Sequence, residues 1–279
     1  MEKNQIQKGA LYVVGTPIGN LSDISDRALS TLSGVDFIAA EDTRVTSKLL
    51  NHFEIKKPLI SYFEHNKLQK GEFICSRILN GESCALVSDA GMPAISDPGE
   101  LLVAQCAESG IPVYVVPGPS AVVSALAVSG LPTGRFTFEG FLSMNKKSRG
   151  EHLNSVQEER RTMVFYEAPH KLLSTLKDML EVFGDRRIAV VRELTKIHEE
   201  VLRTTLKKAV AFYTENPPKG EFVLVIEGCA EKAVESFSLD EAVLIAKDKM
   251  KEGLSASEAA KFASSVSGIK KGEIYKGIV

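Results

Sequence analysis

Residues 86–98 read LVSDAGMPAISDP, and this stretch joins a predicted buried strand to a predicted helix. The apolar run 85–87 is typical of a buried strand, and it ends abruptly at Ser88 and Asp89. Asp97 suits a helix N-cap, and Pro98 suits the first helical position. Loops of this composition at the carboxyl ends of strands are where open α/β sheets bind ligands. The local pattern leaves one simpler alternative open, a tight turn that needs Gly and Pro only for its geometry.

The same alternation of strand and helix continues on both sides of this stretch. The further strands that we expect lie at 11–14, 35–40, 58–63 and 111–116. Apolar residues at helical spacing predict helices at 21–32, 68–79, 101–109 and 121–129. Regular β-α alternation predicts an α/β fold with a largely parallel sheet and helices on both of its faces.

A second α/β unit follows. Its expected strands lie at 135–141, 163–166, 187–191, 201–205 and 222–226, with an amphipathic helix around 172–180. Residues 143–152 are polar and contain Lys146, Lys147 and Arg149, which predicts a mobile basic loop.

After Gly228 the composition shifts to Ala, Lys, Glu and Ser. Expected helices at 239–251, 257–266 and 271–278 form a helix-turn-helix pattern, with Ser255 or Ser257 as a cap. We therefore predict three parts: an N-terminal α/β domain at 1–120, a second α/β domain at 121–230, and a small C-terminal helical module at 231–279.

Composition and simple motifs exclude several classes of protein. The chain has 279 residues and a net charge of -2, so contact with a nucleic acid requires a local basic patch. The start of the sequence has no apolar leader and no long apolar run follows, which predicts a cytoplasmic protein without a membrane span. The four cysteines and five histidines lack metal-ligand spacing, so we predict reduced core thiols and no metal. Pro17 interrupts the one stretch that approaches a dinucleotide-binding GxGxxG motif.

Six predicted strands end in loops that are small, charged or rich in proline. These loops are Gly15-Thr16-Pro17, Glu41-Asp42-Thr43-Arg44, Ser88-Asp89-Ala90-Gly91, Pro117-Gly118-Pro119-Ser120, Glu167-Ala168-Pro169-His170 and Arg192-Glu193-Leu194-Thr195-Lys196. Turn chemistry explains one or two of them, whereas six at strand ends in both α/β units predict one shared cleft.

The motifs of these loops also resemble a known family. The segments VGTPIGNLSDIS, AEDTR, VSDAGMPAISDPG, VPGPSA, GFL, FYEAPHKL and RELTKIHEE occur in this order between Leu11 and Gly228. They are similar to the tetrapyrrole-methylase superfamily, and within it to a branch that modifies ribosomal RNA. The broader family has Gly-Asp-Pro where this chain has Ser88-Asp89-Ala90, and the latter is the pattern of the RNA-modifying branch.

The resemblance implies two α/β domains that hold S-adenosylmethionine in the cleft between them, and a homodimer. It implies 2'-O-methylation of a cytidine ribose in the decoding region of 16S rRNA in the 30S subunit. Matched position by position, the implied cofactor-binding residues are Pro17, Val87, Ser88, Asp89, Met92, Ser120, Ala121, Glu167 and Leu194.

The chemistry of methyl transfer indicates which further residues to consider. A ribose hydroxyl is a poor nucleophile, so a base or a neighbouring cation should assist its deprotonation. The candidates at the cleft are Glu41, Asp42, Arg44, Glu193 and Lys196. Of these, the predicted catalytic residues are Glu41, Arg44, Glu193 and Lys196. For each of them a salt-bridge or capping role is the alternative.

Two other functions remain open, a small-molecule methylase that acts on tetrapyrroles and a nucleotide- or RNA-binding module without catalysis. The basic segment near Lys146 and the helical tail favour RNA, because a tetrapyrrole enzyme needs neither. The predicted RNA-binding residues are Lys146, Lys147, Arg149, Lys270 and Lys271. Lys270 and Lys271 would lie at a helix start, where backbone N–H groups also favour anions.

Overall fold

The computed structural model describes residues 5–230 and 237–279. The chain divides into two compact units, Met1–Cys229 and Ala230–Val279. The first unit contains two β-sheets, each covered by helices, which we call the first and second lobes. The C-terminal module that we predicted begins at residue 231, and its first residues, 231–236, lie outside the described part of the chain.

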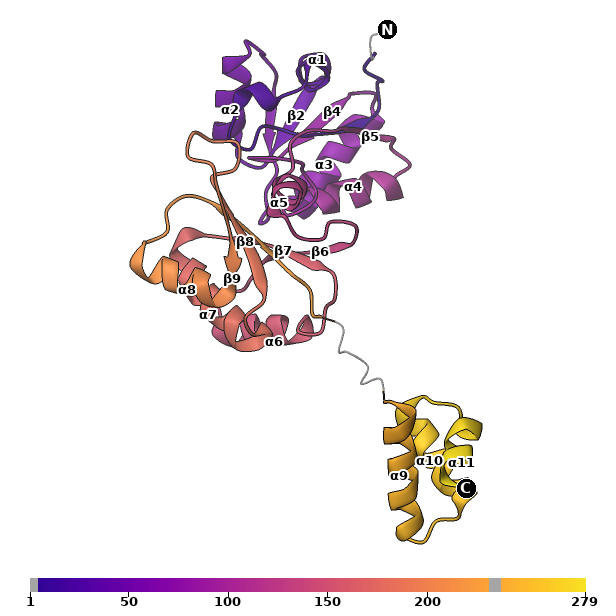
Figure 1. Ribbon diagram of the computed structural model, residues 1–279. Coiled ribbons are helices and arrows are strands. Elements are labelled where there is room, and N and C mark those ends of the chain that lie inside the picture. The colour runs from indigo at the N-terminus through magenta and orange to yellow at the C-terminus, as the bar shows by residue number, and fades with distance from the viewer. Residues whose placement is uncertain (1–4, 231–236) are drawn as a thin grey trace. The chain divides into compact units, whose positions relative to one another are not determined.

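The first lobe is built on a wholly parallel sheet with the strand order β3-β2-β4-β1-β5. Figure 1 shows β2, β4 and β5 of this sheet together with its helices. Its strands are β1 (Leu11–Val14), β2 (Phe37–Ala40), β3 (Leu59–Ser61), β4 (Cys84–Val87) and β5 (Val113–Val116). Its helices are the 3₁₀ turn η1 (Leu21–Asp23), α1 (Asp26–Gly34), α2 (Thr43–His52), α3 (Lys67–Leu79) and α4 (Gly99–Glu108). Alternate strand residues pack against α1 and α2 on one face and against α3 and α4 on the other. The predicted parallel α/β architecture is therefore confirmed.

Two local details of this lobe differ from the sequence-based expectation. Helix α2 was not predicted, because it follows β2 directly and presents only Thr46 and Leu50 as buried residues. The Asp42 side chain caps it by accepting from the Arg44 N–H. Helix α4 begins at Gly99, and its N-cap is Pro98 rather than Asp97, whose carboxylate accepts from the Gly99 N–H at 2.8 Å.

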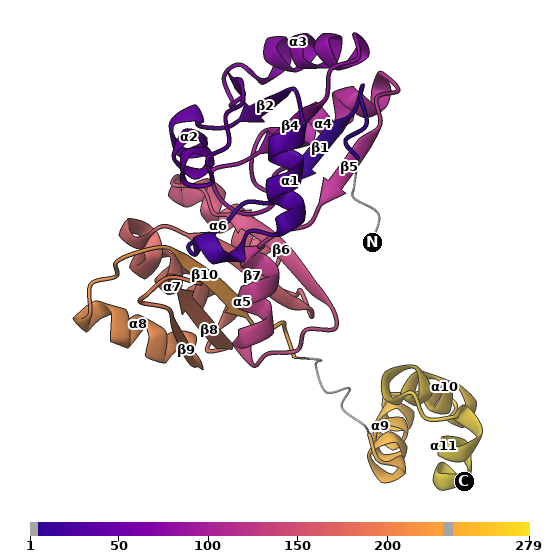
Figure 2. The same ribbon diagram turned by 90° about the horizontal axis from the view of Figure 1, so that it is seen from above.

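The second lobe has a mixed sheet with the order β6-β7-β10-β8-β9. Its strands are β6 (Phe136–Phe141), β7 (Thr162–Glu167), β8 (Arg187–Arg192), β9 (Glu200–Thr205) and β10 (Phe222–Ile226). Only β6 and β7 pair in parallel, and the other neighbours are antiparallel. Helix α5 (Ala121–Ser129) packs on one face, while α6 (Lys146–Ser155), α7 (Pro169–Phe183) and α8 (Leu206–Glu215) pack on the other (Figure 2).

The mobile basic loop predicted at 143–152 is wrong, because residues from Lys146 onward form α6. Asn145 caps this helix by accepting from the N–H groups of Lys147 and Ser148. Arg149 is only 7% exposed, and its guanidinium donates to Asp178 at 2.6 Å and to the carbonyls of Ser143 and Met144. Arg149 therefore fixes α6 to α7 and is not available to RNA, in contrast to our prediction.

The second unit is a three-helix bundle of α9 (Leu239–Lys251), α10 (Ala256–Ser267) and α11 (Lys271–Ile278). Ser238 and Ser255 each form a capping box with the glutamate three residues later, which defines the starts of α9 and α10. A small core of alanines and Ile274 holds the helices together. Throughout residues 5–230 and 237–279, no helix combines the length and apolarity that a membrane crossing requires.

Candidate active site

The loops after β1, β4 and β5 are held against one another at the carboxyl edge of the first sheet. Thr16 and Gly91 exchange two backbone hydrogen bonds, at 2.9 and 3.1 Å, which join the β1 and β4 loops. Gly15 and Gly118 lie so close that a Cβ on either would be under 3.0 Å from the other's backbone. The glycines of two predicted motifs are therefore required by backbone contact, and the contact fixes the loops relative to each other.

Carboxylates join the loops after β2 and β4. The Asp42 N–H donates to Asp89 Oδ1 at 3.0 Å, and the Asp89 N–H donates to Glu41 Oε2 at 3.4 Å. Burial raises the pKa of Glu41, and the nearby charges of Asp89, Asp97 and Asp42 raise it further. Burial likewise raises the pKa of Asp89, with a further contribution from Asp42. Glu41 and Asp89 therefore hold their protons more tightly than exposed carboxyl groups do.

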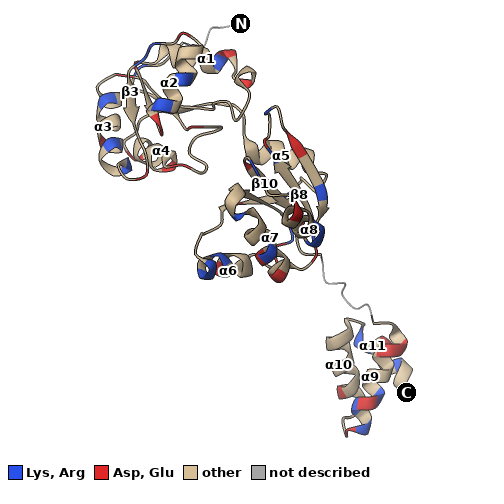
Figure 3. Cartoon of the chain, turned by 90° about the vertical axis from the view of Figure 1, so that its left-hand side faces the viewer, with Lys and Arg blue, Asp and Glu red and all other residues tan. Residues whose placement is uncertain are grey.

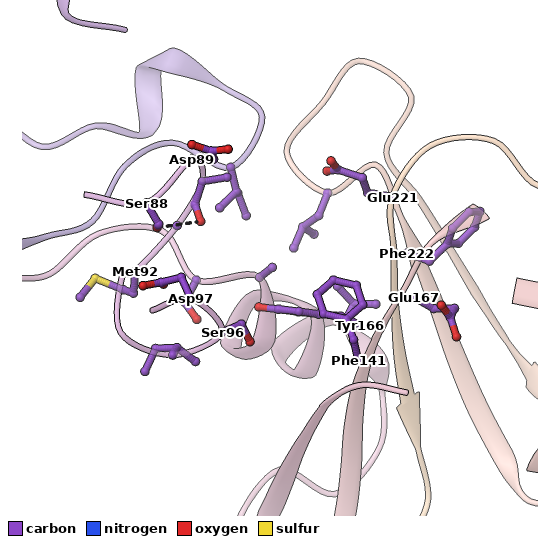
Figure 4. Close-up of a pocket in the computed structure, with 18 of the residues that line it drawn as sticks. Ser88, Asp89, Met92, Ser96, Asp97, Phe141, Tyr166, Glu167, Glu221 and Phe222 are labelled. Carbon is purple, nitrogen blue, oxygen red and sulfur yellow. Dashed lines mark hydrogen bonds between the residues drawn. The ribbon is translucent and has the colours of Figure 1, made fainter. Parts of the chain in front are cut away.

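A cavity of about 560 Å³ lies between the two lobes, at the carboxyl ends of these strands (Figure 4). Ser88, Asp89, Met92, Ser96 and Asp97 line it from the first lobe, opposite Phe141, Tyr166, Glu167, Glu221 and Phe222 of the second. The remaining lining residues are Ile18, Glu41, Ala90, Gly91, Ile95, Ser120, Ala121, Ala168, Pro169, Val191, Leu194 and Val223. We call this the inter-lobe cavity.

Most of the residues that we predicted for the cofactor line this cavity. They are Ser88, Asp89, Met92, Ser120, Ala121, Glu167 and Leu194. Two are placed differently: Val87 is 1% exposed within β4, and Pro17 lines a separate groove beside α2. The structure brings the loop motifs of both lobes together, as the sequence indicated.

Glu167 is the most buried acid of the cavity wall, and its carboxylate is fully engaged. Oε1 accepts from the Ala168 N–H at 2.8 Å and lies 3.0 Å from Lys171 Nζ, while Oε2 accepts from Thr175 Oγ1 at 2.6 Å. Its side chain is 0% exposed. These contacts tie the end of β7 to the first turns of α7, so Glu167 shapes the wall of the cavity.

Glu193 and Lys196 lie beside the inter-lobe cavity and form a salt-bridged loop with Glu221. Lys196 Nζ donates to Glu193 at 2.9 Å and to Glu221 at 3.0 Å. Partial burial opposes the charge of Lys196, but these hydrogen bonds outweigh it and raise the pKa of Lys196. A Cβ on Gly19 would lie 2.5 Å from the Lys196 side chain, so the β1 loop of the first lobe packs directly on this loop.

The same loop carries backbone strain. Glu193 and Thr195 have φ values of 49° and 65°, a region that favours glycine. Such conformations persist only where the surroundings enforce them, and they concentrate at functional sites. The salt bridges of Lys196 and the contact with Gly19 supply that enforcement at the junction of the lobes.

Arg44, the remaining predicted catalytic residue, lies at the start of α2. Its guanidinium folds back onto Asp42, with Nε 3.0 Å from Oδ1, and its side chain is 86% exposed. Hydrogen bonds with Asp42 raise the pKa of Arg44, which keeps it charged.

Sequence reasoning missed the aromatic side of the cavity. Phe141 and Tyr166 lie edge to face with ring centroids 5.3 Å apart, and both line the cavity. They belong to the GFL and FYEAPHKL segments, in which the family resemblance indicates Glu167 but not the aromatic residues as a binding residue. Asp97 was interpreted only as a helix cap, although it also lines the cavity and contributes to the raised pKa of Glu41.

Comparison with known proteins identifies the class of this chain. The family model described as Tetrapyrrole (Corrin/Porphyrin) Methylases matches residues 10–210. The chain belongs to this family and is an enzyme of the methyltransferase class. It is similar to the ribosomal RNA small subunit methyltransferase I of Synechocystis sp., with 47% identity over 269 residues that cover 96% of each chain. The protein of the same name from Thermotoga maritima is 50% identical over 220 residues, which cover 79% of this chain and 99% of that one.

A solved structure supports the fold independently. The uroporphyrin-III-C-methyltransferase from Thermus thermophilus superposes with a TM-score of 0.56 and 20% identity, covering 78% of this chain and 94% of that chain. The sequence-based resemblance and the predicted fold class are therefore confirmed.

Proposed function

We propose that this enzyme transfers a methyl group from S-adenosylmethionine to the ribose 2'-oxygen of a cytidine in the decoding region of 16S rRNA. The observation that carries the proposal is the inter-lobe cavity, whose wall is made by the same motif residues that mark the RNA-modifying branch. The names of relatives that match along nearly the whole chain, such as the Synechocystis protein, support an RNA substrate of the small ribosomal subunit.

The cavity suits the proposed cofactor in size and chemistry. Its volume of about 560 Å³ lies within the range of pockets that hold cofactor-sized ligands. Its wall combines an acid, Asp89, and the hydroxyls of Ser88 and Ser120 with apolar and aromatic surface from Met92 and Tyr166. When bound, S-adenosylmethionine supplies a sulfonium methyl group as the electrophile. Asp89 would accept hydrogen bonds from the ribose diol or the ammonium group, and the apolar residues would exclude water.

Glu41 is our proposed proton acceptor for the ribose hydroxyl. It lines the inter-lobe cavity and also a neighbouring pocket formed by residues from Glu64 to Ala104, so it stands where the two meet. A general base works best when its pKa lies near the working pH, and burial together with the surrounding acids moves Glu41 in that direction. Arg44 stays in the proposal as a cation near this edge of the site.

Glu193 and Lys196 fit a positioning role better than direct proton transfer. Lys196 is engaged by two carboxylates, and the pKa of Glu193 is lowered by the Glu221 N–H and by Lys196. Together they hold Leu194 and Glu221 in the cavity wall. Alignment of the reacting atoms depends on such a rigid wall, and alignment supplies much of the rate of an in-line displacement.

Asp89 provides a test of the cofactor site. Replacement of Asp89 with alanine should weaken S-adenosylmethionine binding by about tenfold or more, because one charge-assisted hydrogen bond is worth about 1.5–3 kcal/mol. Calorimetric titration measures the change. Asp89→Asn keeps an acceptor for the Asp42 N–H and should also bind weakly, which separates loss of charge from loop disruption. Unchanged affinity in both folded variants would remove Asp89 from the binding site.

RNA contacts are proposed on two further segments. Lys146 and Lys147 lie exposed at the start of α6. In the second unit, Lys270 is the N-cap of α11 and Lys271 is its first residue, with Lys271 Nζ 2.9 Å from Ser257 Oγ. Cations at these places would hold phosphates and position the RNA without reading its sequence. A homodimer, which the family resemblance implies, is also part of the proposal.

Removal of residues after Gly228 should leave S-adenosylmethionine affinity unchanged and lower methylation of 30S subunits. The inter-lobe cavity lies wholly within the first unit, and the Thermotoga relative matches only 79% of this chain while being covered almost completely. Lys270→Glu with Lys271→Glu should act in the same direction with less change to the chain. Normal 30S methylation by both variants at physiological salt would make this unit irrelevant to substrate binding.

The function itself is tested by incubating the protein with methyl-labelled S-adenosylmethionine and 30S subunits, then mapping the modified nucleotide. Label on the 2'-oxygen of one decoding-region cytidine is the expected result. Label on a base, or no label in RNA, would overturn the proposal.

A further inference from the structure

A groove of about 340 Å³ lies beside α2. We call it the α2 groove. Its wall consists of Thr16, Pro17, Leu21, Val45, Thr46, Lys48, Leu49, His52, Ser88 and Asp89. Ser88 and Asp89 also line the inter-lobe cavity, so the two spaces adjoin at the β4 loop.

One face of α2 carries two cationic residues and a histidine. Arg44, Lys48 and His52 follow one another at intervals of four residues, which places them on one stripe of the helix. All three are exposed, and the helix contains no acidic residue. Figure 3 accordingly shows blue but no red on α2. Arg44 pairs with Asp42, whereas Lys48 has no ion pair or hydrogen bond from its side chain within residues 5–230 and 237–279. A free cation is therefore available at the middle of the stripe.

Part of the groove beneath this stripe is apolar. Leu21 of η1 and Val45 of α2 are 42% and 39% exposed, and with Pro17 and Leu49 they form an uncharged surface next to the cations. A nucleotide has two kinds of surface that match these, because its phosphates are anionic and its base and sugar present flat or apolar faces. The groove volume also falls within the range for small ligands.

The neighbouring space on the other flank of the site has the opposite charge. The pocket at Glu41 is also lined by Glu64, Asp97 and Glu100, and its one lysine, Lys67, lies 2.5 Å from Glu64. Phosphates approaching that pocket would be repelled. Of these two neighbouring spaces, the α2 groove therefore offers an RNA strand the more favourable charge, through Lys48.

We propose that the α2 groove binds the RNA strand next to the acceptor nucleotide, with a base or sugar on Leu21 and Val45 and phosphates along Lys48 and His52. This inference rests on the proposed function, since it takes RNA as the substrate. None of the residues that line the groove belongs to α6 or to the second unit, and the groove would direct the strand toward the Glu41–Asp89 edge of the cavity.

The test compares Lys48→Glu with Lys208→Glu in the full-length protein. Lys208 is an exposed lysine of α8, so its replacement changes the net charge equally outside the groove. We expect Lys48→Glu to raise the KM for 30S subunits by about tenfold with kcat retained at saturation. A plot of log(kcat/KM) against log salt should have a negative slope, and Lys48→Glu should make that slope shallower by about 1, as for loss of one phosphate contact. Lys208→Glu and Lys48→Arg should resemble the unmodified protein.

Calorimetry with S-adenosylmethionine should give the same affinity for all three variants. A Lys48→Glu protein whose KM and salt slope equal those of Lys208→Glu would overturn the inference while leaving the proposed function intact. Loss of S-adenosylmethionine affinity in Lys48→Glu would also overturn it, because the groove would then serve the cofactor. An unmodified protein that methylates no RNA in 30S subunits would refute the proposed function itself.

Discussion

Replacement of Glu41 with glutamine is expected to lower kcat for methylation of 30S subunits by about 10²–10⁴-fold, the range for loss of a general base. Glutamine keeps the shape of the side chain and an acceptor for the Asp89 N–H, but it cannot take up a proton. Since the carboxylate is proposed to act on the RNA hydroxyl, S-adenosylmethionine affinity should change little. Single-turnover assays with saturating cofactor measure the chemical step directly.

The pH dependence of the unmodified enzyme gives an independent readout. Only the ionised form of Glu41 can accept a proton, so activity should rise as pH increases through its pKa. Because burial and neighbouring acids raise that pKa above the value of 4.5 for an ordinary glutamate, the rise should fall at a correspondingly higher pH. Glu41→Gln should lose this acid limb, whereas Glu64→Gln, from the adjoining pocket, should keep it. A Glu41→Gln enzyme with full kcat and an unchanged acid limb would show that the base lies elsewhere.

The strands and their loops could be predicted from sequence because short apolar runs and Gly- or Pro-containing turns are local signals. Helix α2 has a local signal in its Asp42 N-cap, but it was missed because its only buried residues are Thr46 and Leu50. For segment 143–152 the sequence composition predicted the wrong structure. Its polar composition suggested a loop, but the Asn145 cap and the buried Arg149–Asp178 pair make it a helix.

The candidate site shows the same division between local and long-range information. Motif residues of both lobes meet in the inter-lobe cavity, as their positions after strands indicated. Their individual environments depend on partners far along the chain. Asp89 lies against Glu41 and Asp42, and Lys196 is held by Glu221. The sequence alone does not show which lysines form salt bridges. Lys196 does so, whereas Lys48 does not within the described residues.

Glu167 is expected to matter chiefly for stability. Replacement of Glu167 with alanine should lower the free energy of unfolding by about 3–5 kcal/mol, the usual effect of removing one partner of a buried ion pair. The loss would leave Lys171, whose side chain is only 14% exposed, without its carboxylate, and Thr175 without its acceptor. Urea denaturation followed by circular dichroism measures the change.

A double-mutant cycle distinguishes this ion-pair effect from simple loss of packing. Lys171→Met leaves the Glu167 carboxylate with only its Ala168 and Thr175 donors, so it should also destabilise the protein. Glu167→Leu combined with Lys171→Met replaces the pair with apolar groups, and its cost should be well below the sum of the two corresponding single replacements. Additive costs would mean that the two groups do not stabilise each other. In that case Glu167 would be buried for the sake of the cavity that it lines. A folded Glu167→Gln variant would then be expected to lose S-adenosylmethionine affinity.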